Sequence, residues 1–127
     1  MALRAGDLFQ AQLPDGTTVP HLCIALTDVG GMCSTLFVVP IMTPTPKSDR
    51  TTMMPTIECP EFLQYDSCVV YRSLVEREVN IIEALIVHRY PKPVSASFLA
   101  KVIDGVFKSP LTERGVRQRF KDRLSEI

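Results

Sequence analysis

The chain has 127 residues, of which 46% are hydrophobic and 22% are charged. That length fits one domain of about 100–150 residues, so we expect a single domain over residues 1–127. The apolar fraction excludes an intrinsically disordered chain, and no apolar run approaches the ~18 residues of a membrane-spanning helix. Because the first residues lack the apolar core of a secretory signal, we expect a cytoplasmic protein that does not enter a membrane.

The charge is balanced overall but not along the chain. Lysine plus arginine and aspartate plus glutamate each number 14, whereas residues 101–127 carry seven basic and four acidic groups, a net +3. This segment suits contact with phosphate or with an acidic partner, yet it falls far short of the basic stripe of a duplex-binding protein. A solvated helix face is the favoured interpretation.

Short strands dominate the first two-thirds of the sequence. Residues 7–13 alternate between apolar and polar side chains, and the apolar runs at 21–27 and 34–42 are typical of more buried strands. Pro40 has no amide proton to give to a ladder, so we expect a bulge or a sheet edge there.

Residues 43–65 are punctuated by four prolines and predict a long loop, with a short hairpin arm at 51–54. Its Met53-Met54 pair suits either core packing or a partner surface. Strands are predicted again at 67–72 and 76–80. The run 81–88 suits a strand or a helix, and its β-branched residues favour a strand.

The last third predicts two helices. Ser95 or Ser97 is suited to cap the first one, and a second, more polar helix opens near residues 112–114. Apolar residues recur at helical spacing in both segments: Phe98, Leu99, Val102, Ile103, Val106, Val116, Phe120 and Leu124. We therefore expect a mainly β domain, a small barrel or curled sheet over roughly 5–90, with a helical C-terminus over roughly 94–125.

The cysteines and histidines do not predict a metal site. There are no CxxC pairs and only two histidines, and a structural zinc site needs paired ligands on tight turns. Cys23 and Cys68 lie inside apolar runs, so we expect buried free thiols, and the same is favoured for Cys33 and Cys59.

No catalytic signature stands out. The sequence contains no nucleophile elbow, phosphate-binding loop, HExxH helix or dinucleotide fingerprint. What remains is a set of polar residues at strand ends and in the long loop: Thr17, Thr18, His21, Thr43, Lys47, Arg50, Asp66 and Arg72.

The order of features carries a family resemblance. Gly6-Asp7 opens a strand, and Pro20 leads into the next one. The run FVVPIMT at 37–43 ends in a polar loop, and DSCVVYRSL follows at 66–74. Over roughly residues 5–107 this pattern resembles the MazF/PemK/Kid family of toxin endoribonucleases.

The resemblance implies a small SH3-like barrel of the MazF/PemK/CcdB type with a C-terminal helix. Such proteins are toxins of toxin–antitoxin systems. They are hydrolases that cut single-stranded RNA without a metal or other cofactor, and an antitoxin protein silences them by covering the RNA groove. They are usually homodimers. Single-stranded RNA, an antitoxin and a second copy of the chain are therefore the expected partners.

The resemblance also assigns residues. Thr43 matches the threonine that closes the family's VVPIT strand and stabilises charge on the scissile phosphate. Asp66 matches the acidic residue of a D-Q pair whose glutamine is replaced here, and Arg72 falls at the basic position after that strand. One departure is important: Val19 stands before Pro20, where the family usually has an arginine that acts on the phosphate.

Valine can neither donate a proton nor hold a charge, so another group must supply the missing cation if the protein cleaves RNA. Lys47 and Arg50 are candidates from the adjacent loop, and His21 suits an acid or base because its ordinary pKa lies near neutrality. We thus expect Thr43, His21 and Arg50 as catalytic residues. RNA-binding roles are expected for Thr17, Thr18, Lys47, Asp66 and Arg72.

Simpler hypotheses stand beside these. His21 suits a rim position, Lys47 and Arg50 suit solvated loop charges, and Arg72 suits an ion pair with Glu76 or Asp66. Two functional alternatives follow. One is a non-catalytic barrel of the same type that binds a protein or a nucleic acid, and the other is a barrel that binds phosphates through its basic C-terminal segment.

Overall fold

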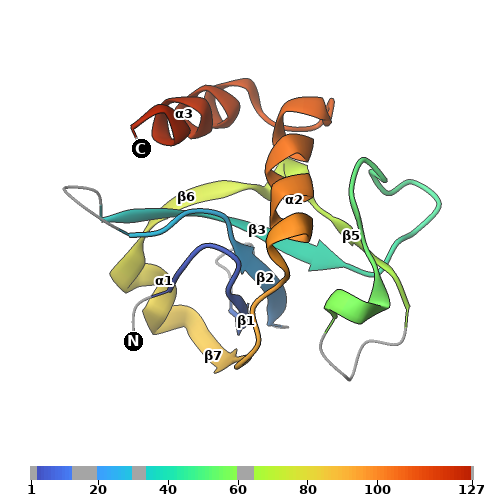
Figure 1. The fold of residues 1–127 in the computed structure, drawn as a ribbon, viewed down its shortest axis with the longest axis horizontal. Helices are drawn as coiled ribbons and strands as arrows, with labels where there is room; N and C mark the ends of the chain where they lie inside the picture. The colour runs from blue at the N-terminus through green and yellow to red at the C-terminus, as the bar shows by residue number, and fades with distance from the viewer. Residues whose placement is uncertain (1–2, 13–19, 30–33, 60–64, 127) are drawn as a thin grey trace.

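The computed structural model describes residues 3–12, 20–29, 34–59 and 65–126. These residues form a mainly antiparallel β structure with helices at the C-terminus, as predicted (Figure 1). The elements are β1 (Leu8–Ala11), β2 (His21–Ala25), β3 (Thr35–Met42), β4 (Met53–Met54), η1 (Thr56–Glu58), β5 (Ser67–Val69), η2 (Tyr71–Ser73), β6 (Val75–Glu78), α1 (Val79–Leu85), β7 (Ile86–Arg89), α2 (Ala96–Lys108) and α3 (Arg114–Ser125).

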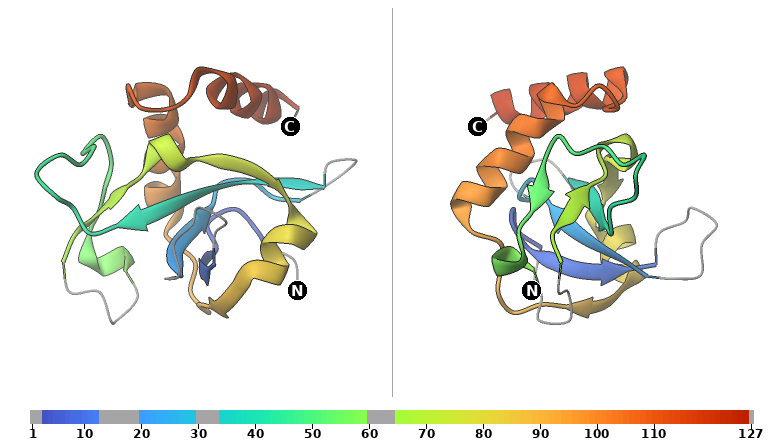
Figure 2. Two further views of the ribbon diagram at one scale, coloured as in Figure 1. Left: turned by 180° about the vertical axis from the view of Figure 1, so that it is seen from behind. Right: turned by 90° about the vertical axis from the view of Figure 1, so that its right-hand side faces the viewer.

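The strands form one sheet in the order β4-β5-β3-β2-β1-β7, and β6 also pairs with β3. Strand β3 therefore carries β2 along one side, and β6 and then β5 along the other. Figure 2 shows that the sheet curls, with β6 beneath α3 and β7 on the opposite side. The pairings among the described strands do not close the sheet, because β6 and β7 do not pair with each other.

Pro40 lies inside β3 with no bulge in the ladder to β2, but on its other side it faces the gap between β6 and β5, a local edge of the pairing. The register between β2 and β3 runs without a shift from Leu22↔Ile41 to Ala25↔Val38. On the other side, the Pro40 carbonyl accepts a hydrogen bond from the Val70 amide at 3.0 Å, just before η2 interrupts the neighbouring strand. The ladder is already broken where proline lacks its donor.

Strands β1, β2 and β3 are buried on both faces of the sheet. On one face, alternate residues of β2 and β3 pack with α2 and α3 in a cluster that includes Ile24, Phe37, Phe98 and Phe120. On the other face, the curled strands enclose a smaller cluster built around Phe9 and α1: Leu3, Phe9, Ala11, Cys23, Ala25, Leu36, Val38 and Ile82. A strand buried on both faces reads as an apolar run, which is why residues 21–27 and 34–42 do not alternate.

The strand predicted over residues 81–88 is in fact a helix followed by a strand. α1 ends at Leu85 and β7 begins at Ile86. Ile82 is buried, and Val79 and Leu85 pack partly buried against the same cluster, whereas Ile81 is exposed. The three inward residues recur at every third position, and this helical period outweighs the β-branching of the segment.

Both C-terminal helices are confirmed. Ser95, not Ser97, caps α2, since its hydroxyl accepts a hydrogen bond from the Phe98 amide at 3.1 Å. The carboxylate of Glu113 caps α3 and accepts from the Gly115 amide at 2.8 Å. These bonds satisfy amide donors that the first turn of a helix leaves without a partner.

Helix α3 is held on the sheet by one aromatic and one arginine. Phe120 packs edge-to-face on Phe37, with ring centroids 5.1 Å apart. Arg123 donates to the hydroxyl and the carbonyl of Thr35 and to the carbonyl of Asp28, and it lies 4.0 Å from the Glu76 carboxylate. Much of the basic C-terminal segment is therefore engaged within the fold.

The expected buried thiols are confirmed for Cys23 and Cys68, which are free and buried. Cys59 is free and half-buried, and Cys33 lies outside the described residues. Of the Met53-Met54 pair, Met54 is fully buried in the core. No helix in the described ranges is both long and apolar enough to cross a membrane.

Candidate functional site

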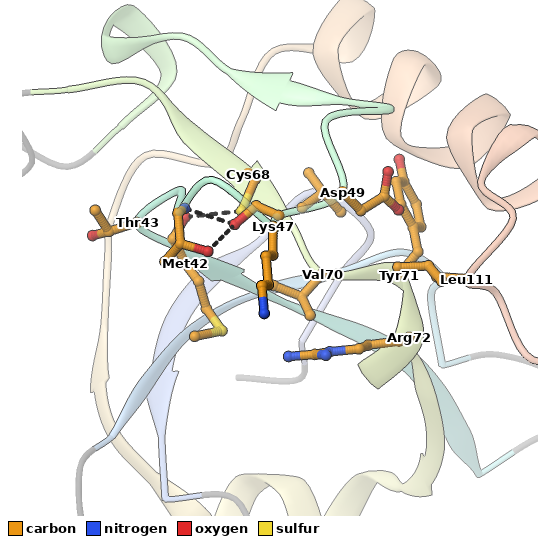
Figure 3. A pocket seen from close by; sticks show the side chains of 12 residues that line it. Met42, Thr43, Lys47, Asp49, Cys68, Val70, Tyr71, Arg72 and Leu111 are labelled. Atoms are coloured by element: carbon orange, nitrogen blue, oxygen red, sulfur yellow. Dashed lines mark hydrogen bonds between the residues drawn. The ribbon is translucent and has the colours of Figure 1, made fainter.

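A hollow of about 310 Å³ opens where β3 and β5 end (Figure 3). Its walls come from four parts of the chain: the strand ends, the loop after β3, the turn η2, and the connection after α2. The lining residues are Met42, Thr43, Thr45, Lys47, Ser48, Asp49, Cys68, Val69, Val70, Tyr71, Arg72 and Leu111.

The loop wall is built by local hydrogen bonds. The Thr45 amide donates to the Ser48 hydroxyl at 2.7 Å, and the Ser48 amide donates to the Thr45 carbonyl at 3.0 Å. Arg50 donates to the same carbonyl at 3.2 Å. Serine and threonine side chains stabilise tight turns in this way, and here the turn carries Lys47.

Asp49 ties this loop to the end of α2. Its carboxylate accepts a hydrogen bond from the Ser109 hydroxyl, and it accepts others from the amide and the hydroxyl of Thr51. Partial burial works to raise the pKa of Asp49, but these hydrogen bonds outweigh it and hold the pKa below its ordinary value. The ionised Asp49 carboxylate therefore stabilises the contact between this loop and the end of α2.

The base of the hollow is fixed by a buried tyrosine. The Tyr71 hydroxyl donates to the Val102 carbonyl at 2.8 Å and lies 2.7 Å from the Thr52 hydroxyl. Burial raises the pKa of Tyr71 to about 12, so the phenol stays protonated at neutral pH. Because Arg72 follows Tyr71 in η2, this contact also fixes the origin of the arginine side chain.

Lys47 and Arg72 give the hollow its charge. Both side chains are exposed, and within the described part of the chain neither forms a hydrogen bond or an ion pair. Figure 3 shows the two cationic ends directed into the same part of the hollow. The predicted pairing of Arg72 with Glu76 or Asp66 is therefore wrong: Glu76 lies against Arg119 and Arg123 instead.

Three of the predicted site residues line the hollow: Thr43, Lys47 and Arg72. Figure 3 shows that the Thr43 side chain points away from the two cations. Arg50 and Asp66 do not line the hollow. Arg50 is turned back on its own loop, and Asp66 accepts a hydrogen bond from the Thr56 amide at 3.2 Å.

His21 begins β2 and does not line the hollow either. The pairing Leu22↔Ile41, continued by one residue, places His21 opposite Met42 at the end of β3. By this register it lies beside Met42, which lines the hollow. Thr17, Thr18 and Val19 lie outside the described residues.

Sequence reasoning did not identify the apolar and anchoring residues at this site. Met42 and Leu111 are exposed at the hollow, and Asp49 braces its wall. An aspartate in a loop rich in serine and threonine is a signal for turn formation. Nothing in the spacing pointed to Ser109, which lies 60 residues away from Asp49.

The arrangement is suited to bind an anion, since it offers two cations, while the ionised Asp49 carboxylate in its lining is hydrogen-bonded to Ser109 and Thr51. The described residues contain no cluster of three or more potential metal ligands. A scan against protein-family models found no match, and a search of curated proteins found no match either.

Proposed function

We propose that the chain is a MazF/PemK-like endoribonuclease that acts on single-stranded RNA without a metal. The observation that carries this proposal is the hollow that joins Thr43, Lys47 and Arg72, in which the described residues offer the two cations no protein partner. RNA carries a negative charge on every phosphate, and lysine and arginine side chains position such a backbone.

The strand order supports an SH3-like barrel as the fold behind this function. Five strands follow the order β7-β1-β2-β3-β6, so the two ends of this ladder are neighbours in sequence and are linked by α1. A helix of this length spans only about 10 Å, which requires the sheet to curl until its ends lie near each other.

The cation pair can stabilise the negative charge that grows on the phosphate during RNA cleavage. In RNA cleavage the 2′-oxygen bonds to the adjacent phosphorus, the bond from phosphorus to the 5′-oxygen breaks, the 2′-hydroxyl loses a proton and the 5′-oxygen gains one. Negative charge grows on the phosphoryl oxygens, and one preorganised donor there is worth about 10²–10³ in rate. We assign this role to Lys47, because Arg50 is turned back on its own loop.

His21 is the candidate for proton transfer, because an imidazole can accept and donate a proton and the register of β2 and β3 places His21 beside Met42. An antitoxin that covers the groove and a homodimer are part of the same proposal. Both follow from the resemblance.

A second candidate is a barrel of the same type that binds single-stranded RNA but does not cut it. Two observations favour it: the Thr43 hydroxyl is directed away from the cations, and Val19 replaces the family's arginine. Binding requires only the cations, whereas cleavage also requires a base and an acid. The basic C-terminal segment is a weaker candidate for phosphate contact, because Arg119 and Arg123 pair with Glu76.

The deciding experiment follows the cleavage of end-labelled single-stranded RNA by the full chain in EDTA. We expect cleavage by the wild type and a loss of about 10²–10³ in rate for Lys47→Ala. Lys92→Ala is the matched control, because Lys92 is also exposed but does not line the hollow. His21→Ala and Arg50→Ala separate the two further catalytic candidates.

The same protein is assayed for RNA binding as a function of salt. Loss of one phosphate contact reduces the magnitude of the negative slope of log affinity against log salt by about 0.7 for a single strand. RNA bound through Lys47 and Arg72 but not cut would select the second candidate. If the wild type neither binds nor cuts RNA, both candidates are wrong.

A further inference from the structure

We propose that the hollow is a single-nucleotide subsite, in which Lys47 and Arg72 hold the phosphate while Met42 holds the face of the base. This inference deepens the proposed function and rests on it for the class of ligand. It adds a requirement that a backbone-binding groove does not have: the site must distinguish a nucleotide from a sugar phosphate.

The walls of the hollow divide into a charged and an apolar part. Met42 is 42% exposed at the end of β3, although the other apolar residues of that strand are buried. Figure 3 shows its thioether directed into the same part of the hollow as the ends of Lys47 and Arg72, with Val70 beside them. An exposed apolar side chain next to two cations favours a ligand with an anionic end and an apolar face.

A nucleotide has that composition, since its phosphate is charged and its base is flat and weakly polar on its faces. The methionine thioether is polarizable and adaptable, and it makes favourable contacts with aromatic rings. The hollow, at about 310 Å³, has the size of the smallest ligand sites in proteins, which begin near 300 Å³. It therefore suits one nucleotide unit of a longer strand.

The walls are also preorganised. The Thr45–Ser48 turn fixes the backbone around Lys47, and the Asp49–Ser109 bond ties that loop to the end of α2. The Tyr71 hydroxyl, bonded to Thr52, fixes the turn that carries Arg72. A site that is already ordered loses less entropy on binding, which favours even a small ligand.

The test is a titration of the full chain with adenosine 5′-monophosphate, uridine 5′-monophosphate, ribose 5-phosphate and inorganic phosphate, followed by calorimetry. Covering about 55 Å² of apolar surface corresponds to about a tenfold change in affinity. We therefore expect both nucleotides to bind at least tenfold more tightly than ribose 5-phosphate. Met42→Ala should remove this difference and leave ribose 5-phosphate binding unchanged, whereas Lys47→Ala should weaken every ligand.

Ile57→Ala is the matched control, because Ile57 is an exposed apolar residue that does not line the hollow. Equal affinities for nucleotides and ribose 5-phosphate would overturn the inference. So would a loss of the difference in Leu111→Ala instead of Met42→Ala, because Leu111 lines the hollow next to Tyr71 and away from Met42 (Figure 3). Nucleotide binding by a protein that does not act on RNA would refute the proposed function alone.

Discussion

Gly105→Ala tests how closely α2 must approach the turn that carries Arg72. Gly105 is buried in α2, and a Cβ atom added there would meet the Tyr71 and Thr52 hydroxyls and lie 2.6 Å from the Tyr71 Cζ. Real Cβ contacts essentially never fall below 3.0 Å, so the helix or the tyrosine must move. Both partners belong to the buried hydrogen bonds that fix η2.

Three terms set the expected change in the free energy of unfolding. Overpacking a buried site costs about 1–3 kcal/mol, and displacing the Tyr71 hydroxyl loses about 1 kcal/mol for one hydrogen bond. Alanine regains about 1 kcal/mol of helix propensity over glycine. The net destabilisation is about 2 kcal/mol, which lowers the melting temperature by about 8 °C in a domain of this size.

Thermal and urea unfolding followed by circular dichroism measure this change. Gly115→Ala is the milder comparison: it also places alanine in a helix, but its nearest neighbour is the Glu113 carboxylate at 3.0 Å, which caps α3 and must shift by only a few tenths of an ångström. This variant should lose less stability than Gly105→Ala. Gly105→Ala should cost less in a Tyr71→Phe background, because the hydroxyl in conflict is gone. A melting temperature of Gly105→Ala at or above that of the wild type would refute the close approach.

Three further predictions concern Arg123, Asp49 and the cysteines, and each is tested by one measurement. Arg123→Ala should lower the free energy of unfolding by about 2 kcal/mol in urea, because it removes charged hydrogen bonds to Thr35. The pKa of Asp49 lies below its ordinary value of 3.8, so its stabilisation is present at neutral pH and is lost as the pH falls below about 4 through the folded-state pKa. Asp49→Asn should therefore show a smaller loss of stability on acidification. Burial raises the pKa of both thiols, that of Cys23 to about 12, but only Cys59 is partly accessible, so iodoacetamide at pH 8 should modify Cys59 slowly and spare Cys23 until urea is added, as read by peptide mass spectrometry.

Local patterns predicted most of the elements because each depends on neighbours in sequence. Ser95 caps α2 as its position suggested, and the apolar run at 34–42 forms the central strand. The prediction of a strand over residues 81–88 was wrong for the part that forms α1. β-Branched residues favour a strand, but burial of Val79, Ile82 and Leu85 on one side favours a helix.

The candidate site was harder to predict because its parts are far apart in the chain. Lys47 and Arg72 come together only when β3 and β5 pair, and a loop charge gives no sign of which strand end it will face. The family resemblance singled out Thr43, yet that hydroxyl points away from the cations. A resemblance assigns positions, whereas side-chain direction depends on the local backbone.

The turn that carries Arg72 begins where the ladder beside Pro40 of β3 ends. The amides and carbonyls of Phe37 face β2, so those of Pro40 face the opposite side, where proline has no proton to donate. The neighbouring chain makes its bond to the Pro40 carbonyl through Val70 and then leaves the ladder as η2. The Val70 carbonyl, which Pro40 cannot reach with a donor, accepts instead from the Ser73 amide at 3.0 Å within the turn. The turn directs Tyr71 into the core beneath α2, and Arg72 lines the hollow. Pro40 therefore lies opposite the point where the chain that carries the second cation leaves the ladder.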